Sequence, residues 1–241
     1  MRIYKYFVFK ILKLYKTKIE SLIIMTIICG IDEAGRGPVI GPLVMAGVAL
    51  NKEDEHILRS LGVTDSKLLS AQKREELYQE IIKLVAAYEI VIVSVEEIDH
   101  ALSAASALNL NWLEAEKCSI ILNKLIPDAA YIDCPSTNIE EYTNYLKKSS
   151  PKKTKLFVQH KADLNHLICS AASIFAKVTR DREIEKLKQQ YNIDFGSGYA
   201  SDPKTQNFIK DNYNLYPFFR KSWDTYKKVI ISKQQKKLTL F

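Results

Sequence analysis

The chain has 241 residues, and 35 Lys and Arg against 28 Asp and Glu give it a formal net charge of +7. Its 47% hydrophobic and 26% charged residues are ordinary for a globular protein, which excludes a wholly disordered chain. The 8 Gly and 7 Pro exclude a collagen-like or low-complexity protein. No apolar run reaches the ~18–20 residues that span a bilayer, so no membrane partner is expected.

Positive charge is concentrated at the two ends of the chain. Residues 1–24 carry six basic residues and one acidic residue, and residues 221–241 carry the same numbers. The residues between them are mildly acidic in sum. This distribution fits a polyanionic partner held near a cation site, and it fits equally well with basic tails that have no specific role.

The cysteines and histidines form no zinc-binding pattern. No C-x-x-C, H-x-x-x-H or H-E-x-x-H spacing is present. We therefore expect free, partly buried thiols in a reducing cytoplasm, at Cys29, Cys118, Cys134 and Cys169.

Residues 1–24 differ from a signal peptide because lysines interrupt their apolar positions and no small-residue cleavage site follows. Met25 is followed at once by a strand pattern. We interpret residues 1–24 as an extra N-terminal segment, either an upstream start-site artefact or a basic amphipathic addition.

Hydrophobic periodicity predicts five strands and several helices. The strands are expected at 26–31, 43–50, 89–95, 129–132 and 155–159, with the first two close enough to pair antiparallel. The helices are expected at 70–87, 98–125 with a possible break near 109–111, 170–190, 203–214 and 222–233. This order predicts an α/β fold with a mixed five-stranded sheet, flanking helices and a helical C-terminal extension.

Three glycines follow the first strand but do not form a dinucleotide-binding loop. Gly35, Gly37 and Gly41 are spaced G-x-G-x-x-x-G rather than G-x-G-x-x-G, and a proline and a strand follow instead of a helix. A Walker pattern is also absent from the sequence. The glycines therefore predict a turn and not a nucleotide-cofactor site.

Acidic residues stand at the ends of three predicted strands: Asp32, Glu33, Asp133 and Asp163. Any one of them could be a cap or surface residue. Carboxylates gathered at one sheet edge repel each other unless a hard cation such as Mg²⁺ or Mn²⁺ neutralises them, and a two-cation site can hydrolyse a phosphodiester. Because neighbours in a strand point to opposite faces, we expect the backbone to leave the strand at Asp32 if Glu33 shares the site.

Six sequence motifs resemble the type 2 ribonucleases H, the ribonuclease HII family, in family order over about residues 30–225. They are GIDEAGRGP at 30–38 followed by Gly41-Pro42, DSK at 65–67, YID at 131–133, KAD at 161–163, SAASIFAKVTRD at 170–181 and GSGYASDPKT at 196–205. The last of these is similar to the archaeal and eukaryotic branch.

The resemblance implies a ribonuclease H-like fold and endonucleolytic cleavage of RNA in RNA–DNA hybrids. It also implies cutting on the 5′ side of single ribonucleotides in duplex DNA, with 3′-hydroxyl and 5′-phosphate products. It assigns the catalytic metal site to Asp32, Glu33, Asp133 and Asp163. It divides the chain into a catalytic core at 25–195 and a helical substrate-binding part at 196–233.

The resemblance also implies how the substrate is read. The Gly35-Arg36-Gly37 turn reads the 2′-hydroxyl, and Tyr199 stacks on a neighbouring deoxyribose. Lys67 and Lys177 are candidate phosphate contacts, although lone lysines are more often solvated. Arg180 could equally pair with Glu183 on its own helix.

The last residues, 234–241, resemble the short peptide that docks on sliding DNA clamps. Gln235, Leu238 and Phe241 have its spacing, and one tight helical turn would bring the two apolar residues to one side. Leu240 stands where such peptides usually carry a first aromatic residue. A frayed basic tail is the alternative.

Two other functions share parts of this evidence. A metal phosphatase would use the same acids without needing the Gly35-Arg36-Gly37 turn or Tyr199. A non-catalytic hybrid-binding protein would be expected to have lost an acid, and none is lost. The related type 3 family carries an added N-terminal domain that 24 residues cannot form. We expect a cytoplasmic, monomeric ribonuclease.

Overall fold

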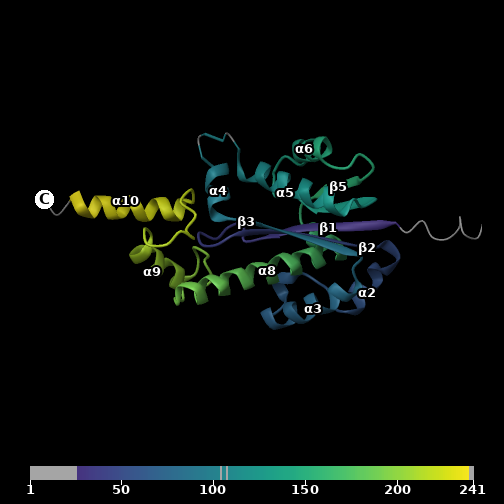
Figure 1. Ribbon diagram of the computed structural model, residues 1–241, viewed down its shortest axis with the longest axis horizontal. Helices are drawn as coiled ribbons and strands as arrows, with labels where there is room; N and C mark the ends of the chain where they lie inside the picture. The colour runs from purple at the N-terminus through teal and green to yellow at the C-terminus, as the bar shows by residue number, and fades with distance from the viewer. Residues whose placement is uncertain (1–25, 104, 107, 239–241) are drawn as a thin grey trace, which may run out of the picture.

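The computed structural model describes residues 26–103, 105–106 and 108–238. At its centre is a five-stranded sheet in the order β3-β2-β1-β4-β5 (Figure 1). The β1–β2 and β2–β3 pairs are antiparallel, and the β1–β4 and β4–β5 pairs are parallel. The predicted mixed five-stranded sheet is confirmed. The strands are β1 Ile27–Ala34, β2 Leu43–Asn51, β3 Ala87–Val93, β4 Ala129–Asp133 and β5 Lys155–Gln159.

Helices cover both faces of the sheet. In Figure 1, α2, α3 and α8 lie below it, α4, α5 and α6 lie above it, and α9 and α10 lie beyond its left end. The bounds are α2 Glu55–Ser60, α3 Ala71–Leu84, α4 Val95–Ala101, α5 Leu110–Leu125, α6 Ile139–Ser149, α7 Ala162–Asn165, α8 Leu167–Tyr191, α9 Pro203–Asn212 and α10 Asp224–Leu238. Two short 3-10 turns, η1 Lys52–Asp54 and η2 Ser66–Leu68, complete the described elements.

The region expected as one helix at 98–125 is two helices. α4 ends at Ala101, and Asn109 begins α5 by accepting a hydrogen bond from the Trp112 N–H at 3.1 Å. An asparagine in this capping position favours a new helix start over continuation. The expected break near 109–111 is therefore confirmed.

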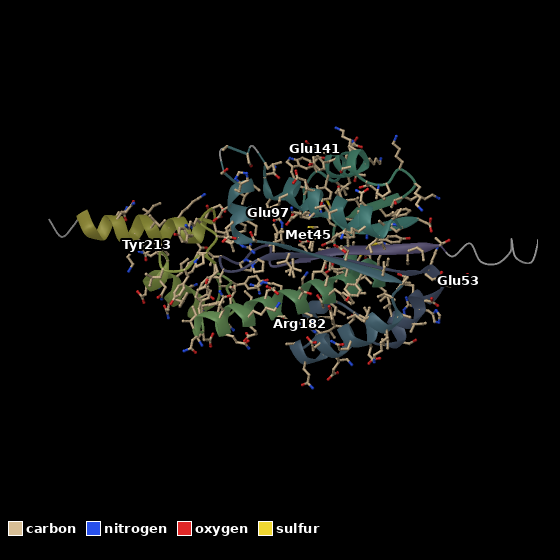
Figure 2. All side chains as sticks on the ribbon, viewed as in Figure 1. Met45, Glu53, Glu97, Glu141, Arg182 and Tyr213 are labelled. Carbon is tan, nitrogen blue, oxygen red and sulfur yellow. The ribbon has the colours of Figure 1, made fainter. Side chains whose placement is uncertain are left out.

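The side chains of β1 alternate between the two faces of the sheet and belong to two separate apolar clusters. Ile28 lies in the cluster between the sheet and α8, while Cys29 and Ile31 lie in the cluster between the sheet and α5 and α6. Met45 of β2 belongs to the second cluster and lies in the middle of the molecule (Figure 2). Because it is buried on both faces, β1 is a rigid support for the residues at its end.

A third apolar cluster joins the C-terminal helices to the loop that follows β1. Val39 and Ile40 pack among Phe195, Phe218 and Phe219. Backbone hydrogen bonds link the same segments: the Gly41 N–H donates to the Phe218 carbonyl at 3.0 Å. The C-terminal part is thereby fixed against the loop that leads from β1 to β2.

The four cysteines are free and buried, as thiols expected in a reducing environment would be. Burial raises the pKa of the Cys29 thiol to about 12. Among the described helices, none combines the length and apolarity needed to cross a bilayer.

Gly30 allows α8 to lie directly on β1. A Cβ at this position would stand 2.2 Å from the Ile168 carbonyl oxygen, a backbone atom that cannot swing away. We expect Gly30→Ala to lower the free energy of unfolding by at least ~1–3 kcal/mol, measured by denaturant titration. Gly62→Ala is the control, because Gly62 has a φ of 83° but open space around it, and it should cost only about 1 kcal/mol. A Gly30→Ala protein as stable as the control would contradict this packing.

Candidate active site

Three acidic side chains meet where β1 and β4 end. Asp32, Glu33 and Asp133 each offer a carboxylate oxygen, and these oxygens all lie within 4.8 Å of one another. The parallel pairing of β1 with β4 places Ile31 beside Ile132, so the acids that follow in each strand are neighbours. Parallel strands thus bring together residues 100 positions apart in the sequence.

Asp32 and Glu33 share this site without a break in the strand. β1 stays paired with β2 through Ala34, so the expected strand end at 31 was wrong, as was the requirement that the backbone leave the strand. Asp32 lies on the α8 side near Ser173, and Glu33 lies on the α5 side near Glu114. The Asp32 carboxylate accepts the Glu33 N–H at 2.7 Å.

Asp163 lies beside this group but outside the set of oxygens within 4.8 Å. It is buried in α7, where its carbonyl accepts a hydrogen bond from the Ser170 hydroxyl at 2.5 Å. The preceding residue, Ala162, donates its N–H to the Asp133 carboxylate at 2.8 Å. Burial raises the pKa of Asp133 and the charge of Asp163 adds to this effect, so the fourth predicted acid borders the other three.

Crowding makes these carboxylates hard to ionise without a cation. Burial, followed by the charge of Glu33, raises the pKa of Asp32 well above its ordinary value. Burial, with Glu114 and Asp133, raises the pKa of Glu33 to about 8. An all-oxygen donor set with this repulsion fits Mg²⁺ or Mn²⁺ and would not suit a softer metal.

The two predicted phosphate-binding lysines stand at the same site. Lys67 of η2 is exposed, and its Nζ lies 3.5 Å from the Asp163 carboxylate. Partial burial would lower the pKa of Lys67, but nearby carboxylates, Asp163 first, raise it. Lys177 is half-buried on α8, where burial and the charge of Arg74 lower its pKa.

The glycine turn follows β1 directly, and Gly35 has a φ of 82° that favours glycine. The Arg36 side chain does not extend freely from this turn. Its Nε donates to the Glu114 carboxylate at 3.0 Å, and its terminal nitrogen donates to the Asn111 side chain at 2.7 Å. Glu114 is fully buried, so this ion pair fixes the turn against α5.

Tyr199 borders the glycine turn. A Cβ on Gly37 would lie 3.9 Å from its ring. The Arg180 guanidinium lies over the Tyr199 ring, 4.9 Å from its centre, and donates to the Ser197 carbonyl at 3.0 Å. Arg180 thus supports Tyr199 and does not pair with Glu183, which pairs with Lys186.

Sequence reasoning missed three residues of this site: Glu114, Arg220 and Trp223. Glu114 has a detectable signal, because it stands one helical turn before Cys118 on the buried side of α5. Arg220 is fully buried and donates to the carbonyls of Gly35, Arg36 and Gly41. No short-range pattern indicates that contact.

The predicted clamp-binding residues lie at the end of the described chain. Gln235 is exposed on α10, which ends at Leu238. Phe241 lies outside the described residues, as does the N-terminal segment 1–24. The tail therefore stays a prediction.

The chain is similar to known proteins over most of its length. The family model "Ribonuclease HII" matches residues 29–226. The chain is 43% identical over 217 residues to ribonuclease HII of Pyrococcus furiosus, covering 88% of this chain and 94% of that protein. It is likewise 43% identical over 221 residues to ribonuclease HII of Methanococcus maripaludis, covering 88% and 90%.

Solved structures agree with this assignment. Ribonuclease H2 from Pyrococcus horikoshii matches with a TM-score of 0.76 and 40% identity, over 85% of this chain and 97% of that one. The ribonuclease HII in a complex with PCNA from Archaeoglobus fulgidus matches with a TM-score of 0.76 and 42% identity, over 84% and 96%. With the family model and these relatives covering most of its length, the chain belongs to the ribonuclease HII family and is a nuclease with ribonuclease H activity.

Proposed function

We propose that this enzyme cuts the RNA strand of RNA–DNA hybrids and also cuts on the 5′ side of a single ribonucleotide embedded in duplex DNA. The products carry 3′-hydroxyl and 5′-phosphate ends. The observation that supports this best is the meeting of Asp32, Glu33 and Asp133 within 4.8 Å, directly next to a glycine turn that a sugar could approach. The acids proposed for metal-dependent hydrolysis and the turn proposed for sugar recognition are thereby adjacent.

The four acids, Asp163 included, hold Mg²⁺ or Mn²⁺ in this proposal. When bound, the cation supplies positive charge that activates water and offsets the charge developing on the phosphate. The side chains of Asp32, Glu33 and Asp133 fix its position, because their strands are buried on both faces. Lys67 and Lys177 contact neighbouring phosphates and position the duplex.

The glycine turn and Tyr199 select the substrate in this proposal. Backbone groups of Gly35, Arg36 and Gly37 can approach a 2′-hydroxyl closely because the two glycines have no Cβ. Tyr199 stacks on the adjoining deoxyribose, held in place by Arg180. The pair would therefore recognise an RNA–DNA junction, since one reads a ribose and the other a deoxyribose.

A sliding DNA clamp is the proposed protein partner. The matched relative from Archaeoglobus fulgidus was solved as a PCNA complex. In this chain α10 extends away from the sheet (Figure 1), so a partner bound at the end of this helix would lie away from the strands that carry the acids. Gln235, Leu238 and Phe241 are the proposed contacts, and docking there would leave the catalytic edge open to DNA.

Asp133→Asn tests the metal site. The variant should lose cleavage by at least ~100-fold, because one of three converging carboxylates becomes neutral, and hybrid binding should remain. The measurement is a gel assay on a duplex with one ribonucleotide, with and without a chelator, reading the position of the cut. Glu140→Gln, an exposed acid on α6, is the matched control and should cut normally. Full activity of Asp133→Asn, or cutting by wild type in excess chelator, would refute the proposed mechanism.

Stability should depend jointly on pH and metal. Glu33 has a raised folded pKa of about 8, so the metal-free protein loses stability as pH rises from the unfolded value of 4.5 through 8. A bound cation stabilises the folded protein by about 2.7 kcal/mol at a hundredfold excess over its Kd, and its Kd falls as pH rises because it binds the ionised carboxylates. The Tm difference between MgCl₂ and EDTA should therefore be larger at about pH 8 than at about pH 6. An equal difference at both pH values would contradict the crowding described here, and Glu33→Gln should reduce the dependence.

Phe241→Ala tests the clamp contact. Burial of this aromatic ring should contribute about 1.5–3 kcal/mol of binding free energy, so its loss should weaken binding to a sliding clamp by roughly ten- to hundredfold. The measurement is isothermal titration calorimetry or surface plasmon resonance. Thr239→Ala is the matched control, because this residue lies outside the motif spacing. Both variants should cut a short duplex normally. Unchanged clamp affinity of Phe241→Ala would refute the tail contact.

A further inference from the structure

One buried guanidinium holds both ends of the glycine turn. Arg220 donates to the Gly35 carbonyl at 2.6 Å, to the Arg36 carbonyl at 3.1 Å and to the Gly41 carbonyl at 2.9 Å. The side chain is fully buried and comes from the segment between α9 and α10, 185 residues away from Gly35. The planar fork of arginine suits this arrangement, because its donors diverge at fixed angles.

Trp223 completes the contact. Its indole N–H donates to the Gly37 carbonyl at 3.0 Å, and the Arg220 guanidinium lies 4.7 Å from the centre of a Trp223 ring. All three carbonyls of the turn are thus bound by two side chains of the C-terminal part.

Binding these carbonyls fixes the direction of the turn's N–H groups. No peptide bond among the described residues is cis, and in a trans peptide the carbonyl and the following N–H point in opposite directions. The Arg36 and Gly37 N–H groups therefore point away from Arg220. Within the described part of the chain neither N–H has a hydrogen-bond acceptor. Pro38 has no N–H, so these two are the donors that the arrangement directs outward.

The segment that carries both side chains is anchored independently of the turn's carbonyls. Asp99 of α4 accepts the backbone N–H groups of Lys221 and Ser222 at 2.8 and 2.9 Å. The Arg220 N–H donates to the Val39 carbonyl at 2.9 Å. The backbone that carries Arg220 and Trp223 is therefore fixed by hydrogen bonds to α4 and to the loop after β1.

Arg220 has no carboxylate ion pair among the described residues. Burial, followed by the charge of Arg180, lowers its pKa to about 9, so the guanidinium remains protonated at neutral pH. A buried charge is costly unless its hydrogen bonds are satisfied, and here the backbone carbonyls satisfy them. The buried Arg220 guanidinium is therefore satisfied only while the turn keeps its carbonyls in these positions.

We propose that Arg220 and Trp223 are positioning residues that direct the Arg36 and Gly37 N–H groups toward the 2′-oxygen of the ribonucleotide. This inference rests on the proposed function and names residues that set its specificity. Neither side chain touches the substrate itself. Their effect is on the preference for a duplex that contains a ribose over the same duplex without one.

Trp223→Phe is the main test, because it removes one donor and keeps an aromatic ring beside Arg220. Two constants are measured for each enzyme: kcat/KM on a duplex with one ribonucleotide, and the inhibition constant of the same duplex made only of DNA. Trp223→Phe should lower kcat/KM by about three- to tenfold, the range of one hydrogen bond, while the inhibition constant and Tm stay close to wild type. Tyr216→Phe, a ring of the same aromatic cluster that does not contact the turn, should change neither constant.

Arg220→Lys extends the test. A lysine keeps the charge but cannot reach three carbonyls with a fixed fork, so the loss in kcat/KM should exceed that of Trp223→Phe. If Arg220→Lys fails to fold, Trp223→Phe still decides the question. Unchanged kcat/KM for Trp223→Phe, or an equal loss of affinity for the all-DNA duplex, would overturn the positioning role. Failure of the wild-type enzyme to cut the ribonucleotide duplex would instead refute the proposed function, and this inference with it.

Discussion

Repulsion between carboxylates is the constraint around which the rest of the molecule is arranged. Asp32, Glu33 and Asp133 lie closer together than three charged groups would remain in water. They stay there because β1 and β4 are buried between two helical layers, which leaves the strand ends little freedom to separate. The folded protein therefore carries a stored electrostatic cost at one point, and a divalent cation relieves it.

The C-terminal part packs against the loop that follows β1, next to the acidic cluster. Its aromatic cluster packs on the loop after β1, and Arg220 and Trp223 bind the carbonyls of the turn within that loop. From the other side, buried Glu114 binds the Arg36 side chain. The turn is thus fixed by α5 on one side and by the segment between α9 and α10 on the other, beside the acids at the ends of β1 and β4.

Much of this could be read from the sequence, for identifiable reasons. The five strands are apolar runs ending in turn residues, and the acids stand at their ends, so both were predictable from local pattern. β1 was expected to end at 31 because Asp32 and Glu33 break the apolar run, yet pairing with β2 continues through Ala34. α6 was missed although its buried residues Tyr142 and Leu146 stand at helical spacing and Asn138 caps it by accepting the Glu141 N–H. The contacts of Arg36 and Arg220 depend on residues 75 to 185 positions away, and no periodicity encodes such pairs.

The 185-residue separation between Arg220 and Gly35 has an evolutionary consequence. A chain whose segment between α9 and α10 came from another protein would keep the acidic cluster but lose the donors Arg220 and Trp223, which bind the neighbouring loop. An exchange of one segment between distant relatives would place the loop after β1 beside side chains whose length or position differs from that of Arg220 and Trp223. We therefore expect a substitution in one of these two segments to be tolerated only where the other segment still fits it.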